Sequence, residues 1–448
     1  MTSTLNTADL PLQGLRVIEM GDAWAGPYTA TLLADLGAES IRIETVRRRP
    51  AIIRGTPLDA YPHPLYPEAD PGEAAIERHI FLHAVDHNKR SITLDLKDDR
   101  GSDLVHKLFA ISDVFVFNFT PSALARLGLH PDDLAKRHPH LIIASILGFG
   151  LHSPYPDYVS VGSTTDGFCG HTSLRGYPDT APLDNTGILY TDSVAACTAT
   201  FAIQAALRQR QDTGLGQIID ISQAEATTAH FAHAITDYAW NDRISGPGGA
   251  DKQISGPGGA DRQASGNDHP TAAPHNTYRC VDTPSGDEQW IAIACFTDPH
   301  WQSLATFIDD PTLTNHPPYR TALKRWKHRH DLDTYLDVWT RDKDAHQLAA
   351  QLQAAGVPAQ ALMSAADLAH DPQLQERNFL TRIDHPHIGE RLHTQPFFTF
   401  NGQRSTLHRA ASTLGQDNQY VLQDLLGLSP DECATLEANH VIGTRFLE

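Results

Sequence analysis

The residues best suited to chemistry near the start of the chain form the glycine turn GDAWAG, from Gly21 to Gly26. The apolar run before this turn is typical of a parallel strand that is buried on both faces. The residues after it favour a helix that begins at Pro27 and ends at Gly37. A strand, a turn and a helix in this order put backbone N–H donors and the positive end of a helix at the carboxyl edge of a sheet. We therefore expect an anionic ligand at this turn.

Two common phosphate motifs do not fit the turn. Its two glycines are followed by Pro27 and Tyr28, where an ATP-binding P-loop has a lysine and a hydroxyl. The turn also lacks the G-x-G-x-x-G pattern of dinucleotide-binding proteins. Glu44 nevertheless lies at about the distance of a ribose-binding acid, so a nicotinamide dehydrogenase remains an alternative.

The composition limits the class of protein. The 448 residues include 35 Lys and Arg against 54 Asp and Glu, which gives a formal charge of −19. This charge argues against a nucleic-acid partner, whose phosphates would have to be neutralised. The sequence has no apolar run long enough for a membrane span and no basic start or apolar core of a signal peptide, so we expect a cytoplasmic protein. The length is sufficient for two or three domains.

Cysteines and histidines give no firm metal or disulfide motif. The five cysteines are scattered without C-x-x-C spacing, which predicts reduced thiols. His230, His233 and Asp237 would share one face of a helix expected over 224–240, but a polar helix face explains them equally well. His328 and His330 are two residues apart and would point away from each other on a helix. We expect no metal site.

Strands and helices alternate through the first part of the chain. The segment NKRSITLDLK, Asn88 to Lys97, reads as a strand with alternating apolar residues, and a long irregular loop over 45–78 precedes it. This alternation predicts an α/β fold with a doubly wound, mostly parallel sheet. Further strands are expected at 113–119, 140–150 and 217–222, and further helices at 98–110, 121–127 and 194–210.

The second half has a different organisation. A ten-residue unit, ISGPGGADKQ, is almost duplicated within 242–266, and its glycine and charge predict a mobile loop. A hairpin, helices and a short strand follow, which suggest a small α+β domain. The expected domains are a large domain that begins with 1–223, a linker helix and glycine-rich loop at 224–274, the small domain at 275–350, and a segment at 351–448 that returns to the large domain.

Taken together, these residues resemble the class III CoA-transferases, which include formyl-CoA:oxalate and carnitine CoA-transferases and are related to α-methylacyl-CoA racemases. The resemblance implies a Rossmann-like large domain built from both chain ends, a small central domain, and two chains threaded as interlocked rings. It also implies an acyl-CoA donor and a carboxylic acid acceptor as substrates, a homodimer, and no permanently bound cofactor besides the substrate coenzyme A. It is carried by LQGLRVIEM, AGPYTATLLADLGAESIRIE, NKRSITLDLK, Asn118 to Pro121, TDSVAAC, TGLGQIIDIS and AAGVPAQALMSAADLAHDPQLQERNFL.

In the transferases an aspartate at the head of an alanine-rich helix is the covalent nucleophile, and Asp192 in TDSVAAC matches it. A carboxylate can attack an acyl-CoA thioester to give a mixed anhydride and free CoA thiolate, and the thiolate can then return to form an enzyme-CoA thioester. Aspartate is also a favoured helix N-cap, and both roles could hold.

The resemblance also implies a CoA site. Lys97 and Arg126 suit the phosphates, because fixed cations localise an anionic ligand on an acidic protein. Thr45 stands where the formyl-CoA enzymes have an arginine, and Leu147 stands where they have a lysine. The residues that match the family's CoA contacts are Trp24, Ala25, Leu94, Lys97, Asn118, Phe119 and Arg126, and those near enough to compensate for Thr45 are Arg42, Arg47, Arg48 and Arg49.

Two other functions are compatible with the sequence. A racemase-like acyl-CoA epimerase needs an acid and a base that flank the α-carbon, and the corresponding region contains Asp166 and His171 but lacks the racemases' G-H-D motif. A non-catalytic CoA-binding protein is the other alternative, against which the presence of Asp192 speaks. The sequence does not identify the acid of the donor acyl-CoA or the acceptor acid.

Overall fold

The computed structural model describes residues 10–50, 52–55, 64–177, 190–242, 266–314 and 316–447. These residues divide into two compact units, of which unit 1 comprises those within 10–171, 186–233 and 372–447. Unit 2 comprises those within 172–185 and 234–371. The duplicated glycine-rich unit at 244–263 lies outside the described residues.

A six-stranded parallel sheet forms the centre of unit 1, in the order β3-β2-β1-β4-β5-β6. The α/β fold with a parallel sheet is thus confirmed. In this strand order the path of the chain across the sheet changes direction between β1 and β4. Ligands of such folds bind beyond the carboxyl ends of the strands at that point. The strands are β1 (Arg16–Met20), β2 (Glu39–Glu44), β3 (Lys89–Thr93), β4 (Val114–Phe117), β5 (Ile142–Leu147) and β6 (Ile218–Ser222).

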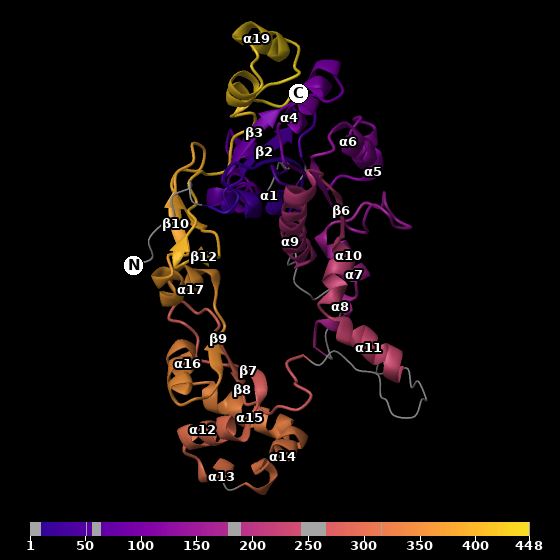
Figure 1. Cartoon of the computed structure of the whole chain (residues 1–448). Helices are drawn as coiled ribbons and strands as arrows, with labels where there is room; N and C mark the ends of the chain where they lie inside the picture. The colour runs from indigo at the N-terminus through magenta and orange to yellow at the C-terminus, as the bar shows by residue number, and fades with distance from the viewer. Residues whose placement is uncertain are drawn as a thin grey trace. The chain divides into compact units, whose positions relative to one another are not determined.

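Helices cover both faces of this sheet (Figure 1). Successive strand residues point to opposite faces, so Val17 packs with the alanines of α9 while Ile18 lies in the core that contains Leu104 of α4. The helices of unit 1 are α1 (Ala25–Asp35), α2 (Ala75–Arg78), α3 (Ile80–Val85), α4 (Asp99–Ala110), α5 (Pro121–Ala125), α6 (Pro131–Arg137), α7 (Gly162–Phe168), α9 (Tyr190–Thr213), α10 (Gln223–Ala229), α18 (Pro372–Glu376) and α19 (Pro430–Ala438), with the short turns η2 (Pro67–Ala69) and η6 (Tyr420–Leu425).

Residues of the C-terminal segment bond to β3, the edge strand of this sheet. The carboxylate of Asp417 accepts a hydrogen bond from the Ser91 N–H of β3 at 3.0 Å, and the Asn418 side chain accepts one from the Thr93 N–H at 2.9 Å. Leu436 of α19 lies in the same core as Leu104 and Leu108 of α4. Edge-strand donors are thereby satisfied within the chain. The remaining strands of unit 1 are β10 (Leu380–Ile383), β11 (Arg391–Thr394), β12 (Thr399–Phe400) and β13 (Gln403–Arg404).

Unit 2 contains a three-stranded antiparallel sheet in the order β7-β8-β9, which includes the expected hairpin. Its own core gathers apolar side chains from these strands and from the helices that follow, among them Ile291, Leu332 and Leu352. The elements are β7 (His275–Arg279), β8 (Trp290–Ala294), β9 (Ala359–Ala361), α12 (Asp298–Ile308), α13 (Pro311–Thr314), η5 (Pro317–Tyr319), α14 (Ala322–Lys327), α15 (Arg329–Thr340), α16 (Ala345–Ala354) and α17 (Ala365–His370), while α8 (His171–Leu174) and α11 (Ala232–Asn241) cross the unit boundary.

The structure corrects several predicted boundaries. The single helix expected over 224–240 is two helices, because the N–H groups of His230 and Phe231 bond to carbonyls three residues earlier and end α10 in a tight turn. His230 therefore lies outside the helix that carries His233 and Asp237, and the spacing proposed for a metal site does not hold. Helix α1 begins two residues before Pro27, which is compatible with proline because the first four N–H groups of a helix have no partner within it.

Strand β3 ends at Thr93, so Leu94 and Lys97 follow it instead of belonging to it. The short helix α6 was not predicted. Among the described residues, none of the helices is both long enough and apolar enough to cross a membrane.

Candidate functional site

The glycine turn is held by an asparagine from the neighbouring strand end. Asn118, which follows β4, accepts a hydrogen bond from the Asp22 N–H at 3.1 Å and donates one to the Asp22 carbonyl at 2.7 Å. A Cβ atom on Gly26 would lie 3.1 Å from Cγ of Asn118, and one on Gly21 would lie 2.8 Å from Cδ of Pro27. The glycines therefore permit the close approach that joins the ends of β1 and β4.

Asp192 lies at the N-terminal end of α9, and its side chain is turned toward this turn. The residue is 5% exposed. Its carboxylate accepts hydrogen bonds from the backbone N–H of Ala25, the first residue of α1, and from the side chain of Gln223, the first residue of α10. Both described donors come from other helices, which distinguishes this arrangement from a simple N-cap of α9.

The environment of Asp192 changes its protonation. Burial, together with the negative charge of Asp166, raises the pKa of the Asp192 carboxyl to about 6, while the hydrogen bonds from Ala25 and Gln223 act in the opposite direction. At neutral pH the group is mostly an ionised carboxylate that is poorly solvated. Such a carboxylate is a competent nucleophile because little water has to be removed before it attacks.

Asp166 belongs to a second acid–base group beside Asp192. The Nδ1 atom of His171 lies 3.3 Å from a carboxylate oxygen of Asp166, and both side chains are largely buried. The His171 ring packs on Tyr190 at a centroid distance of 4.7 Å and stacks on Phe231 at 5.9 Å. The region that the racemase alternative singled out therefore presents a carboxylate near Asp192, with an imidazole beside that carboxylate.

The residues expected to contact CoA occupy different environments. Trp24 is partly buried, and its indole N–H has no acceptor among the described residues. Leu94 is 1% exposed and its side chain belongs to the sheet core, so only its backbone is available to a ligand. Phe119 packs against the same core. Lys97 and Arg126 are exposed, and Lys97 follows β3 while Arg126 follows α5.

The arginines near Thr45 are not equivalent. Arg42 is buried and pairs with Asp86 at 3.1 Å and with Glu44 at 3.7 Å, so it cannot replace a ligand-binding arginine. Arg47 pairs with Asp95, and Arg49 donates to the Arg54 carbonyl at 3.1 Å. Arg48 is exposed and has no ion pair among the described residues. It is the arginine of this group whose charge is available.

Glu44 is not a ribose ligand. Its two carboxylate oxygens accept hydrogen bonds from Nε and a terminal nitrogen of Arg54 at 2.6 and 2.7 Å, and Ser91 donates a third at 2.8 Å. The carboxylate is almost fully buried. This bidentate pair removes the observation on which the dehydrogenase alternative depended.

Sequence reasoning did not assign Gln223 to the site, and it noted Asp166 only in the racemase comparison. Gln223 directly follows β6, so its position at the carboxyl edge of the sheet was a usable signal. Asp166 gave no such signal, because the described residues of 148–177 contain no strand to place it.

Comparisons with known proteins show what the whole chain is similar to. The sequence model of CoA-transferase family III matches residues 12–418. A succinyl-CoA:D-citramalate CoA-transferase from Chloroflexus aurantiacus is 31% identical over 432 residues, which cover 96% of this chain and 98% of that protein. A succinate–glutarate CoA-transferase from Agrobacterium fabrum is 29% identical and covers 84% and 85% of the two chains. The crystal structure of a CAIB/BAIF family protein from Brucella suis matches with a TM-score of 0.75 at 27% identity and covers 93% and 99%.

The raised pKa of Asp192 predicts a measurable cost to stability. The folded-state pKa of about 6 lies above the ordinary 3.8, so ionisation opposes folding: the cost is absent below pH 3.8 and complete above pH 6. Two pKa units correspond to about 3 kcal/mol. We expect Asp192→Asn to raise the free energy of unfolding by up to that amount at mildly alkaline pH, and the gain to vanish in acid. Urea unfolding across pH measures it.

Asp212→Asn is the matched control for this experiment. Asp212 lies on the same helix but is exposed, with Arg208 at 2.9 Å. Its substitution should change stability little and without the same pH dependence. A lower stability of Asp192→Asn at alkaline pH would contradict the assigned environment.

Proposed function

Because this chain belongs to CoA-transferase family III, we propose that it moves CoA from an acyl-CoA donor to a free carboxylic acid through covalent intermediates on Asp192. The observation that carries the proposal is the buried Asp192 carboxylate, which is held by the Ala25 N–H and Gln223 beside the glycine turn. This place is the carboxyl edge of a parallel sheet, where an anionic CoA ligand is expected.

In the proposed reaction a carboxylate oxygen of Asp192 attacks the thioester carbon of the donor. The C–S bond breaks, and the products are a mixed anhydride and CoA thiolate. The thiolate then attacks the aspartyl carbonyl, which releases the donor acid as its carboxylate and leaves an aspartyl-CoA thioester. No proton has to be gained or lost in these two steps.

The second half reverses this order with a new acid. The acceptor carboxylate attacks the aspartyl-CoA thioester, which expels CoA thiolate and forms a second anhydride. The thiolate attacks the acceptor's acyl carbon, and the products are the new acyl-CoA and the free Asp192 carboxylate. The energy of the thioester is conserved throughout, provided that water does not intercept an intermediate.

The surroundings of Asp192 suit both the attack by its carboxylate and the exclusion of water. The Ala25 N–H and Gln223 are fixed donors at the oxygens on which charge changes during each attack, and fixed dipoles need no reorganisation. Burial limits the access of water to the anhydride. The raised pKa makes the carboxylate more basic than an exposed aspartate, which favours attack at neutral pH.

We propose a dicarboxylic acid as one of the two acids. The names of two relatives pair succinyl-CoA with D-citramalate and succinate with glutarate, and all of these acids carry two carboxyl groups. Arg48, as an exposed cation in the segment that follows β2, is available to a second carboxylate or to a CoA phosphate.

An acyl-CoA epimerase is a second candidate, because Asp166 and His171 form an acid–base pair beside Asp192. Epimerisation exchanges the α-hydrogen of the acyl group with solvent, whereas transfer does not. Incubation of the protein with acyl-CoA in heavy water, without an acceptor acid, separates the two. Transfer requires the acyl group to keep its hydrogen.

We further propose that the functional form is a homodimer. In unit 1, Tyr158, Val159, Phe168 and Phe201 are each at least 60% exposed, and Phe149, Tyr155 and Phe168 form contacting aromatic pairs. Exposed apolar clusters of this kind usually mark an interface. The family resemblance supplies the expected occupant, a second copy threaded through the first.

Replacement of the nucleophile should abolish transfer. We expect Asp192→Ala to lower kcat by about 10⁴-fold or more, because no other route to the covalent intermediates exists. Asp212→Ala, on the same helix, is the control and should keep the activity. Transfer is measured by chromatography of the acyl-CoA products. Substantial activity in Asp192→Ala, with the control active, would refute the assignment.

The exposed cations should contribute to CoA binding. We expect Lys97→Ala and Arg126→Ala each to raise the KM for acyl-CoA about fivefold, which corresponds to about 1 kcal/mol, with kcat little changed. Arg100→Ala is the control, because Arg100 is an exposed arginine that pairs with Asp98 at 2.8 Å. Equal KM values for all three variants and the unmodified enzyme would remove these residues from the CoA site.

Threaded chains cannot separate without unfolding. Sedimentation should therefore show a dimer at every concentration, down to the detection limit, while the protein remains folded by circular dichroism. A folded monomer at high dilution would contradict the interlocked arrangement.

A further inference from the structure

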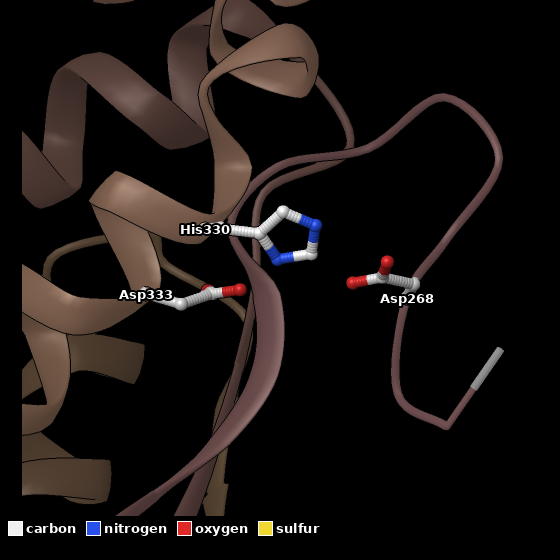
Figure 2. Close-up of side chains that lie close together, drawn as sticks. All are labelled: Asp268, His330 and Asp333. Carbon is white, nitrogen blue, oxygen red and sulfur yellow. The ribbon is translucent and has the colours of Figure 1, made fainter. Parts of the chain in front are cut away.

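Unit 2 brings together three potential metal ligands that the transfer reaction does not use. Donor atoms of Asp268, His330 and Asp333 all lie within 4.8 Å of one another. Figure 2 shows the His330 ring between the two carboxyl groups, with Asp333 on the same helix and Asp268 on a separate segment. No other group of three such side chains occurs among the described residues.

The fold explains why these three side chains lie close together. His330 and Asp333 are three residues apart near the start of α15, which places them on one helical face. Asp268 comes from the segment that leads into β7. Its neighbours are anchored there, because the Asn267 side chain donates to Thr277 at 2.9 Å and the indole of Trp326 donates to the His269 carbonyl at 3.0 Å.

Asp333 is oriented by partners behind it. The hydroxyl of Tyr278, which is 1% exposed, donates to one oxygen of Asp333 at 2.6 Å, and the Asn276 side chain donates to the other at 3.2 Å. Each oxygen keeps a lone pair for a further partner. Hydrogen bonds of this kind fix the direction of metal-binding carboxylates and are part of many metal sites.

The two other groups are available from the open side. Arg329 contacts only Oδ2 of Asp268, at 2.8 Å, and Oδ1 has no hydrogen bond among the described residues. His330 is exposed, and its ring nitrogens have no hydrogen-bond partner in the described part of the chain. An ion could therefore bind His330 and Oδ1 of Asp268 without breaking a hydrogen bond of the described residues.

The charges also favour a cation. The carboxyl groups of Asp268 and Asp333 are partly buried and their donor atoms lie close together, so two negative charges at this place repel each other. A divalent ion between the carboxylates would reverse that effect. Arg329 offsets part of the charge of Asp268 through Oδ2, which leaves Oδ1 without a hydrogen bond among the described residues.

We propose that Asp268, His330 and Asp333 bind a divalent transition-metal ion, with Zn²⁺ as the best fit. One imidazole and two carboxylates are ligands that Zn²⁺ accepts, whereas Mg²⁺ and Ca²⁺ prefer oxygen alone. The ion would clip the segment before β7 to α15. This role is structural, is separate from the chemistry at Asp192, and stands or falls independently of the proposed function.

The competing interpretation is a simple ion-pair cluster, in which Arg329 and a protonated His330 balance the two carboxylates. Metal binding separates the two cases. We would strip tag-free full-length protein with a chelator, add Co²⁺ as a spectroscopic probe, and displace it with Zn²⁺. We expect one Zn²⁺-displaceable Co²⁺ per chain beyond any weak background, and a raised melting temperature of unit 2 with Zn²⁺.

The variants assign that ion to the site. His330→Ala and Asp268→Asn should each abolish one equivalent of binding, and Tyr278→Phe should weaken it about tenfold by releasing Asp333. His328→Ala is the control, because His328 is an exposed neighbour that faces Asp331 at 3.4 Å. Unchanged binding in His330→Ala and Asp268→Asn, or no saturable binding in the unmodified protein, would overturn the proposal.

Discussion

The proposed chemistry of unit 1 depends on the burial of one carboxylate where three helices begin. Asp192 of α9 meets the first N–H of α1 and the first side chain of α10, and each of these helices follows or covers the parallel sheet. The alanines of α9 permit this approach, because Ala195 and Ala199 are fully buried in one core with residues of the sheet and of α1. A larger side chain at these positions would move Asp192 away from Ala25 and from the turn.

Contacts other than those of Asp192 stabilise this region, and they offset the unfavourable burial of the Asp192 charge. Asn118 fixes the glycine turn, and Arg54 binds Glu44 and Glu77 in a buried network that closes the loop after β2. Asp417 and Asn418 accept hydrogen bonds from backbone N–H groups of β3. These contacts hold the backbone around Asp192 without touching its carboxylate, as the proposed covalent changes of that group require.

The sequence predicted the sheet well because its strands are short apolar runs bounded by glycine and charge, and such runs are local signals. It predicted Asp192 only through the family resemblance, since an aspartate before alanines is otherwise a helix cap. It failed where the partner is distant in sequence. Arg42 looked like a free cation, but Asp86 lies beside it in the fold. His330 was judged against His328, whereas its neighbours are Asp333 and Asp268.

The central claim is that Asp192 becomes covalently linked during transfer. The most direct measurement is peptide mass spectrometry after incubation with acyl-CoA donor and hydroxylamine, which converts an activated aspartyl group into a hydroxamate. The account predicts a donor-dependent hydroxamate at Asp192 and at no other carboxyl group. Modification of a different carboxylate, or active transfer with Asp192 unmodified, would contradict it.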